Sequence, residues 1–300
     1  MFYLKKFRVI SLAILANLLW STAFVGVKIG LIYSSPLLFA GMRFILAGLF
    51  LLPFCGGVRN YFTSICYNIK TIIILSFFQT FLLYSLFFFG MTLVRGSTGA
   101  IVNGSAPLLA AVAAHIFLKN DKLSINKTIY ILGGIFGIVL LSIDRQFIAK
   151  GSIKELIGIL ILLVATFASS IGNVIVAIDN SEIEPIPLNS AQMGLGGIML
   201  LFLSLLVEGS PKVVFDKQFI FALIWLSFIS AAGFSIWFYL LKKEKVKVSE
   251  LNMWKFIVPG SGALISWMFL KDDSPTPLSI MGMVIVATSV LLFNLRKITP

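Results

Sequence analysis

Charged residues are scarce in this sequence of 300 residues, and their scarcity excludes most soluble folds. Only 12% of the residues are charged and 59% are hydrophobic, against roughly 25% charged in soluble domains. A soluble chain of this composition could not cover its surface with polar groups. A helix needs about 20 mostly apolar residues to cross the hydrocarbon core of a bilayer, and about ten such helices would leave no soluble domain over.

Histidine and cysteine are also rare. His115 is the only histidine, which excludes a His-rich metal site and leaves no choice of base for a Ser-His-Asp triad. No glycine-rich loop ends in Gly-Lys-Ser or Gly-Lys-Thr, which excludes the phosphate loop of ATP-hydrolysing enzymes. Cys55 and Cys66 fall in one segment that we expect to be cytoplasmic, where free thiols are favoured over a disulfide. We therefore expect no enzyme activity, no cofactor and no metal.

Apolar runs of spanning length alternate with short polar breaks along the chain. We predict an all-α integral membrane protein with ten transmembrane helices, near residues 9–28, 36–54, 70–92, 99–118, 126–143, 155–178, 189–207, 218–241, 249–270 and 277–295. The half-apolar segment 55–70 leaves nine or eleven spans open. The first run extends from Val9 to about Val27, longer than the roughly 7–15 apolar residues of a signal peptide, so we expect an uncleaved first helix.

The net charge of +12 comes from Lys and Arg that lie singly or in small groups between the apolar runs. This pattern excludes a continuous basic face for nucleic acid and follows the positive-inside rule of membrane proteins. With the N-terminus inside, 14 of the 24 Lys and Arg fall in inner segments, 8 in outer segments, and Arg43 and Lys255 within helices. We therefore predict a multi-pass protein of the cell (plasma or inner) membrane, embedded in the lipid bilayer with both termini in the cytoplasm.

The sequence repeats itself at an offset of 152 residues. Residues 117–121 (FLKND) reappear as 269–273 (FLKDD), and Pro107 has its counterpart in Pro259 at the same offset. We predict two equivalent five-helix halves, residues 1–150 and 151–300. Because five is odd, the second half would be inverted in the membrane relative to the first. Inverted repeats around a midplane site are a design of transporters.

With these features the chain resembles the drug/metabolite transporter superfamily, specifically its ten-helix EamA-type members. The matching residues are spread over the full length and are Trp20-Ser21, Pro36 with Arg43, Pro107, Asp121, Pro259 and Asp273. The family usually has Glu at the positions of Asp121 and Asp273, where this chain keeps the negative charge. The resemblance implies a central cavity lined by helices 1–4 and 6–9, with helices 5 and 10 at the periphery.

Two cations lie within predicted helices, where a charge is costly unless it faces water, a cavity or a partner. Arg43 either lines the central pathway, or forms a structural ion pair or extends to the interface. Lys255 either lines the cavity or pairs with Glu250. It precedes Pro259 by four residues, so the proline leaves the carbonyl of Lys255 without its usual partner. Asn103 is the counterpart of Lys255 in the first half.

Four aromatic residues complete the candidate substrate-binding set, because a ring with a polar atom can stack on a solute. They are Trp20, Tyr84, Trp237 and Trp254. The alternative for each is a place in the core, facing lipid or in the interfacial belt. Gly133 and Gly137 form a pair of small residues that packs a helix closely, either within the chain or in a homodimer.

Acidic residues, 12 in all, fall in loops or within a turn or two of a span end, so we expect no carboxylate at the bilayer midplane. This argues against proton-coupled antiport of cationic drugs, which needs a buried carboxylate. We expect an exporter or exchanger of small polar metabolites, such as amino acids or other anionic or zwitterionic solutes, that works by alternating access. A nucleotide-like metabolite exchanger and a non-transporting scaffold or lipid-handling subunit are the alternatives.

The predicted topology can be tested with single cysteines in a background where Cys55 and Cys66 are replaced by serine. Tyr3→Cys and Ile298→Cys should resist an impermeant thiol reagent in intact cells, because both termini are predicted to be cytoplasmic. Ser210→Cys, in a predicted outer loop, is the matched control and should react. Labelling at only one terminus would contradict the even number of spans.

Overall fold

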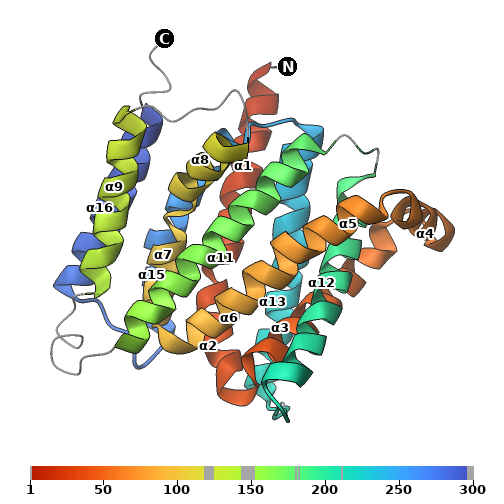
Figure 1. Ribbon diagram of the computed structural model, residues 1–300, viewed down its shortest axis with the longest axis horizontal. Helices are drawn as coiled ribbons and strands as arrows, with labels where there is room; N and C mark the ends of the chain where they lie inside the picture. Colours follow the sequence, from red (N-terminus) through yellow and green to blue (C-terminus); the bar gives the residue numbers. More distant parts are fainter. Residues whose placement is uncertain are drawn as a thin grey trace.

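The computed structural model describes residues 2–117, 125–142, 153–179, 181, 183–210 and 212–295, and these fold into a bundle of helices (Figure 1). In chain order the elements are α1 (Phe2–Ser21), α2 (Ala23–Tyr33), α3 (Pro36–Leu51), η1 (Leu52–Phe54), α4 (Val58–Tyr67), α5 (Ile69–Leu75), η2 (Ser76–Leu82), α6 (Leu83–Leu93), α7 (Gly96–Asn103), α8 (Ala106–Phe117), α9 (Ile125–Ser142), α11 (Ile153–Ile178), α12 (Pro185–Val207), α13 (Lys217–Phe238), η3 (Tyr239–Lys243), α14 (Val248–Met253), η4 (Trp254–Phe256), α15 (Ile257–Phe269) and α16 (Pro277–Leu295). Asp121 and the predicted boundary between the halves at residue 150 lie outside the described residues.

Among the residues that the structure describes, seven helical stretches are long and apolar enough to cross a membrane. They are Phe7–Tyr33, Pro36–Phe54, Ile69–Leu93, Gly96–Phe117, Ile153–Ile178, Pro185–Val207 and Lys217–Lys243. Shorter apolar helices cover Thr128–Gly137, Ile257–Phe269 and Pro277–Ser289. Helices satisfy their own backbone hydrogen bonds, as hydrocarbon requires. The predicted class, an all-α membrane protein, is confirmed; the count of ten spans stays a prediction.

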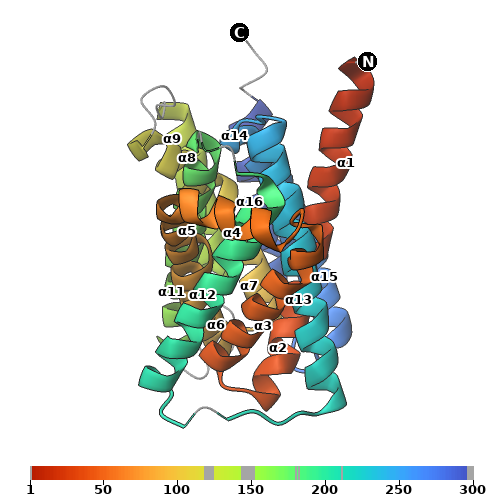
Figure 2. The same cartoon turned by 90° about the vertical axis from the view of Figure 1, so that its right-hand side faces the viewer.

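The helix α1 begins, and α16 ends, at the same end of the bundle (Figure 1). Figure 2, turned by 90°, shows the same arrangement. We call this the terminal end and the opposite one the distal end. An even number of crossings would produce this arrangement. That the terminal end faces the cytoplasm stays a prediction.

Two helices are interrupted inside the bundle, each just before a proline. α7 ends at Asn103, four residues before Pro107. In the second half the interruption is the tight turn η4, which contains Lys255, four residues before Pro259. A proline ring clashes with the carbonyl four residues earlier and removes one hydrogen bond. The prolines therefore place both breaks at polar side chains.

The two interrupted helices cross with no room for a side chain at the contact. A Cβ atom added to Gly104 would lie 2.0 Å from Cγ of Pro259. One added to Gly262 would lie 2.7 Å from Cβ of Ala100. Small residues allow membrane helices to approach this closely and to gain van der Waals contact. The crossing joins the two predicted halves of the chain next to both helix breaks.

The helices α9 and α16 pack against each other at one edge of the bundle (Figure 1). A Cβ atom on Gly133 would lie 3.0 Å from Oγ of Ser289, and one on Gly137 would lie 2.9 Å from Cγ2 of Ile285. This pair of small residues is therefore used for packing within the chain. A homodimer stays a prediction.

Replacing Gly104 by alanine should lower stability by about 1–3 kcal/mol, the usual cost of overpacking, because the new methyl group would overlap Pro259. Gly260→Ala is the matched control, since nothing lies within 4 Å of its Cβ position. Thermal unfolding in detergent should give a lower midpoint for Gly104→Ala. The midpoint of Gly260→Ala should stay or rise, because alanine favours a helix by about 1 kcal/mol over glycine. Equal midpoints would contradict the close crossing.

Candidate functional site

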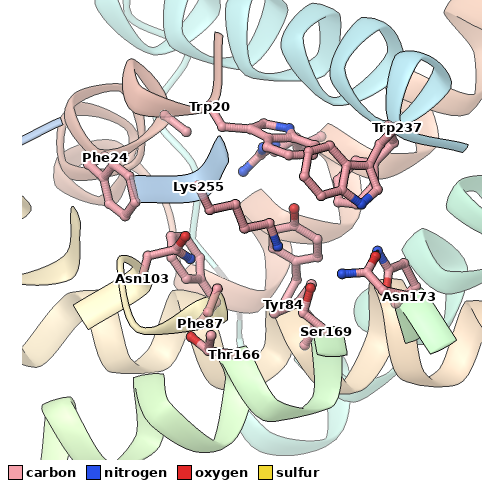
Figure 3. Close-up of a pocket in the computed structure, with 16 residues that line it drawn as sticks. Trp20, Phe24, Tyr84, Phe87, Asn103, Thr166, Ser169, Asn173, Trp237 and Lys255 are labelled. Atoms are coloured by element: carbon pink, nitrogen blue, oxygen red, sulfur yellow. The ribbon is translucent and has the colours of Figure 1, made fainter. Parts of the chain in front are cut away.

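A cavity of about 70 Å³ lies inside the bundle (Figure 3). Its lining comes from both predicted halves, from α1, α2, α3, η2, α6, α7 and α8 in the first and from α11, α13 and η4 in the second. Six of the seven residues predicted to bind a substrate line it, namely Trp20, Arg43, Tyr84, Asn103, Trp237 and Lys255. The structure thus brings these residues together, while their role in binding stays a prediction.

Trp254 is the exception, because it lies outside this cavity. Its ring is half-buried against the hydrophobic core. The turn η4 has about three residues per turn, so neighbouring side chains leave the backbone in very different directions. Lys255 therefore lines the cavity while the residue before it does not, and a role of Trp254 in binding stays a prediction.

The cavity also holds polar residues that were not predicted from the sequence. Thr166, Ser169 and Asn173 project from α11, and Gln79 projects from the wide helical turn η2. The three on α11 are spaced three and four residues apart, which puts them on one face of the helix. A polar stripe with this spacing in an otherwise apolar helix is the sequence signal that identifies them.

Arg43 is held in the bundle by hydrogen bonds and aromatic rings. Its Nε donates to the carbonyl of Leu226 at 3.3 Å and to Oγ of Ser230 at 2.9 Å. The guanidinium carbon also lies over three rings, at 4.9 Å from the centroid of Phe44, 5.3 Å from Tyr84 and 5.7 Å from Phe88. The side chain is 1% exposed. Ring faces attract a desolvated cation, and no carboxylate of the described residues pairs with this one.

Lys255 reaches into the middle of the cavity. Figure 3 shows its side chain extending between the two tryptophans, Trp20 and Trp237, and Tyr84. Its Nζ lies 5.1 Å from the ring centroid of Trp237 and 5.9 Å from that of Trp20. The ammonium makes no ion pair with any side chain that the structure describes. The side chain of Glu250, the alternative partner, lies outside what the structure describes.

Buried N–H groups around the cavity lack hydrogen-bond partners among the described residues. These groups are Trp20 Nε1, Arg43 Nη1, Asn173 Nδ2 and Trp237 Nε1. Of the buried side-chain acceptors in the described lining, only Gln79 Oε1 lacks a hydrogen-bond partner. Buried polar groups are ordinarily satisfied, so an excess of donors favours a ligand that brings acceptors. The described lining contains two cations and no carboxylate, which suits an anionic group.

At the distal end, a carboxylate of the second half holds the start of a helix of the first half. Buried Asp273 accepts hydrogen bonds from the backbone N–H of Ser97 at 2.7 Å and from its Oγ at 2.6 Å. The first N–H groups of a helix have no partner within it and attract negative charge. Nearby, Lys28 Nζ donates to the carbonyls of Met91 and Val94. The contact between Asp273 and Ser97 fastens the two predicted halves together at this end.

Ion pairs gather near the end of α13, at the terminal end. They are Lys242–Asp179, Lys243–Glu184 and Arg8–Glu244. Burial disfavours the charged form of Asp179, but hydrogen bonds from Lys242 and Ser181 outweigh it and lower the pKa of this carboxyl. Asp179, Glu184 and Glu244, the acids of these three ion pairs, therefore lie at the end of the bundle and away from the cavity.

The chain is similar to a known family over nearly its whole length. The model of the "EamA-like transporter family" matches it twice, over residues 7–143 and 156–295. "Uncharacterized transporter YoaV" of Bacillus subtilis is 25% identical over 295 residues, covering 94% of this chain and 96% of that protein. "Probable amino-acid metabolite efflux pump" of Escherichia coli is 27% identical over 301 residues, covering 95% of each.

Solved structures with the same fold exist, and one of them covers nearly the whole chain. A crystal structure described only as that of a protein superposes with a TM-score of 0.68 and 16% sequence identity. The superposition covers 98% of this chain and 99% of that one. At this identity the likeness concerns the fold alone.

Replacing Asp273 by asparagine should loosen the distal end, because it removes the charge that holds the start of α7. Loss of such a cap costs about 0.5–2 kcal/mol, so we expect the distal end to open about 2- to 30-fold more often. The readout is the labelling rate of Asn103→Cys, without Cys55 and Cys66, by an impermeant reagent added to each side in turn. Asp272→Asn, which changes the exposed neighbouring acid, is the control. Equal distal labelling in both variants would contradict the fastening role.

Proposed function

The chain belongs to the EamA-like transporter family, and we propose that it exports small metabolites that carry a carboxylate. Such solutes include amino acids and other anionic or zwitterionic compounds, and the proposed mechanism is alternating access. Its family and the names of its relatives identify it as a membrane transporter and not an enzyme. The observation that carries the proposed substrate class is the cavity itself, where Arg43 and Lys255 meet partnerless N–H groups without a carboxylate in the described lining.

Size and polarity of the cavity favour this function over the alternatives. A scaffold or lipid-handling subunit would have a dry, fully packed core between the halves, whereas this core contains a cavity lined by Arg43, Lys255 and several neutral polar side chains. A volume of about 70 Å³ favours small solutes over nucleotide-like ones. The relative named as an efflux pump supports export over uptake.

Alternating access would use matching contacts at the two ends. In the inverted-repeat hypothesis, the offset of 152 makes Asp121 and Ser249 the counterparts of Asp273 and Ser97. In the proposed cycle, the contact between Asp273 and Ser97 closes the distal end, and a contact between Asp121 and Ser249 would close the terminal end. Rocking of the halves would exchange one contact for the other, exposing the cavity to each side in turn.

The proposed location is the cell membrane, with both termini in the cytoplasm. The excess of Lys and Arg in the predicted inner segments supports it. The common position of the start of α1 and the end of α16 at one end of the bundle supports it as well. In this orientation the fastened distal end faces outward, and solutes enter the cavity from the cytoplasm.

Arg43→Gln and Lys255→Gln test the function directly, because glutamine keeps the length and a donor but removes the charge. Each should insert normally and lose about 10- to 100-fold in transport of anionic substrates, since a hydrogen bond to a charged group is worth about 1.5–3 kcal/mol. The readout is efflux of a panel of labelled amino acids and organic acids from proteoliposomes.

Lys247→Gln, at an exposed position, is the control for the loss of one positive charge. A Lys255→Gln protein that transports normally but unfolds at a lower temperature would show that this lysine is structural. The preference for anionic groups would then depend on Arg43 alone.

A further inference from the structure

We propose that the cavity selects organic anions that have a carboxylate but no ammonium group, so that a 2-oxo acid is preferred to the amino acid of the same carbon skeleton. The inference rests on the proposed transport function and narrows its substrate class. It follows from what the cavity offers to each end of an amino acid. A carboxylate finds complementary groups there, and an ammonium group does not.

The carboxylate end is matched by charge and by hydrogen-bond donors. Arg43 Nη1, Trp20 Nε1, Trp237 Nε1 and Asn173 Nδ2 have no partner within the described residues. Lys255 adds an ammonium without an ion pair there. A carboxylate has only acceptor atoms when ionised and can receive several donors at once. Bonds between ionised groups are the strong ones, so an anion would complete the donors that the chain leaves open.

An ammonium group would meet two like charges and no acid. The lining holds Arg43 and Lys255 and, in its described residues, no Asp or Glu. In a cavity of about 70 Å³, no position is far from both cations. Juxtaposed like charges are a common device for rejecting a wrong ligand. A zwitterion would therefore lose at its amino group part of the binding free energy that it gains at its carboxylate.

The aromatic rings cannot take over the role of an acid, because the protein's own cations already use the best of them. Tryptophan attracts cations most strongly, and Lys255 lies over both tryptophans of the cavity. Arg43 lies over Tyr84. A substrate ammonium would have to displace these contacts to reach the same faces.

Hydrogen-bond acceptors are also in short supply. An ammonium brings three donors. Among the buried side-chain atoms of the described lining that lack a partner, four are N–H donors and one, Gln79 Oε1, is an acceptor. The oxo group of a 2-oxo acid brings an acceptor instead and fits the excess of donors.

Matched pairs of substrates test the proposal in proteoliposomes that contain the full chain. Initial rates and half-saturation would be measured for labelled pyruvate against alanine and for phenylpyruvate against phenylalanine, at one pH near neutrality, with protein-free vesicles subtracted. We expect the 2-oxo acid of at least one pair to be favoured about tenfold or more in the ratio of rate to half-saturation. If the amino acid is transported as well as or better than its 2-oxo acid in both pairs, the inference is overturned and the proposed function is left intact. If no member of either pair is transported, both fail.

Lys255→Glu provides a second, independent readout. It places a carboxylate where the ammonium now lies and should shift the ratio toward the amino acid by about tenfold or more. Lys255→Gln should weaken transport of the 2-oxo acid without improving that of the amino acid. Lys247→Glu, at an exposed site, makes the same charge change outside the cavity and should leave the ratio unchanged. A folded Lys255→Glu protein with an unchanged ratio would overturn the role of Lys255; should it fail to fold, the wild-type ratio decides.

Discussion

A charge inside hydrocarbon must be solvated by the protein itself, and the centre of this bundle is organised around that requirement. Lipid offers no hydrogen bond and no counterion to Arg43 or Lys255. The protein surrounds the first with two oxygen acceptors and three rings, and the second with two indole rings. Aromatic faces are a compromise here, because they attract a cation without cancelling its charge. The positive potential therefore persists in the cavity.

The broken helices provide this centre with its polar groups. Pro107 and Pro259 each interrupt a helix four residues earlier, at Asn103 and Lys255. A regular helix would pass the same point with its backbone groups bonded internally and its side chains packed. The close crossing at Gly104 then joins both breaks, so that two helices from different halves share one contact and one cavity. The same two helix breaks thus determine both the close packing of the halves and the polar lining of the cavity.

Much of the site could be predicted from the sequence, because a charge within an apolar run has few places to go. That argument identified Arg43 and Lys255, and the proline offset then added Asn103. Trp254 could not be separated from its neighbour, since only the tight geometry of η4 decides which side chain enters the cavity. Asn173 was hidden for a different reason. Neutral polar residues in membrane helices ordinarily bond to other helices, and its contact with Gln79 is of that kind although both line the cavity.

The absence of acids from the described cavity lining bears on the energy source of transport. A cell that keeps its interior electrically negative expels anions without further help, because each elementary charge that crosses gains about 2.3 kcal/mol for every 100 mV of membrane potential. A carrier of organic anions that works outward therefore needs no proton-binding carboxylate at its centre, and this chain keeps its acids in loops and near helix ends. Voltage alone would hold the cytoplasmic concentration of such a substrate below the external one.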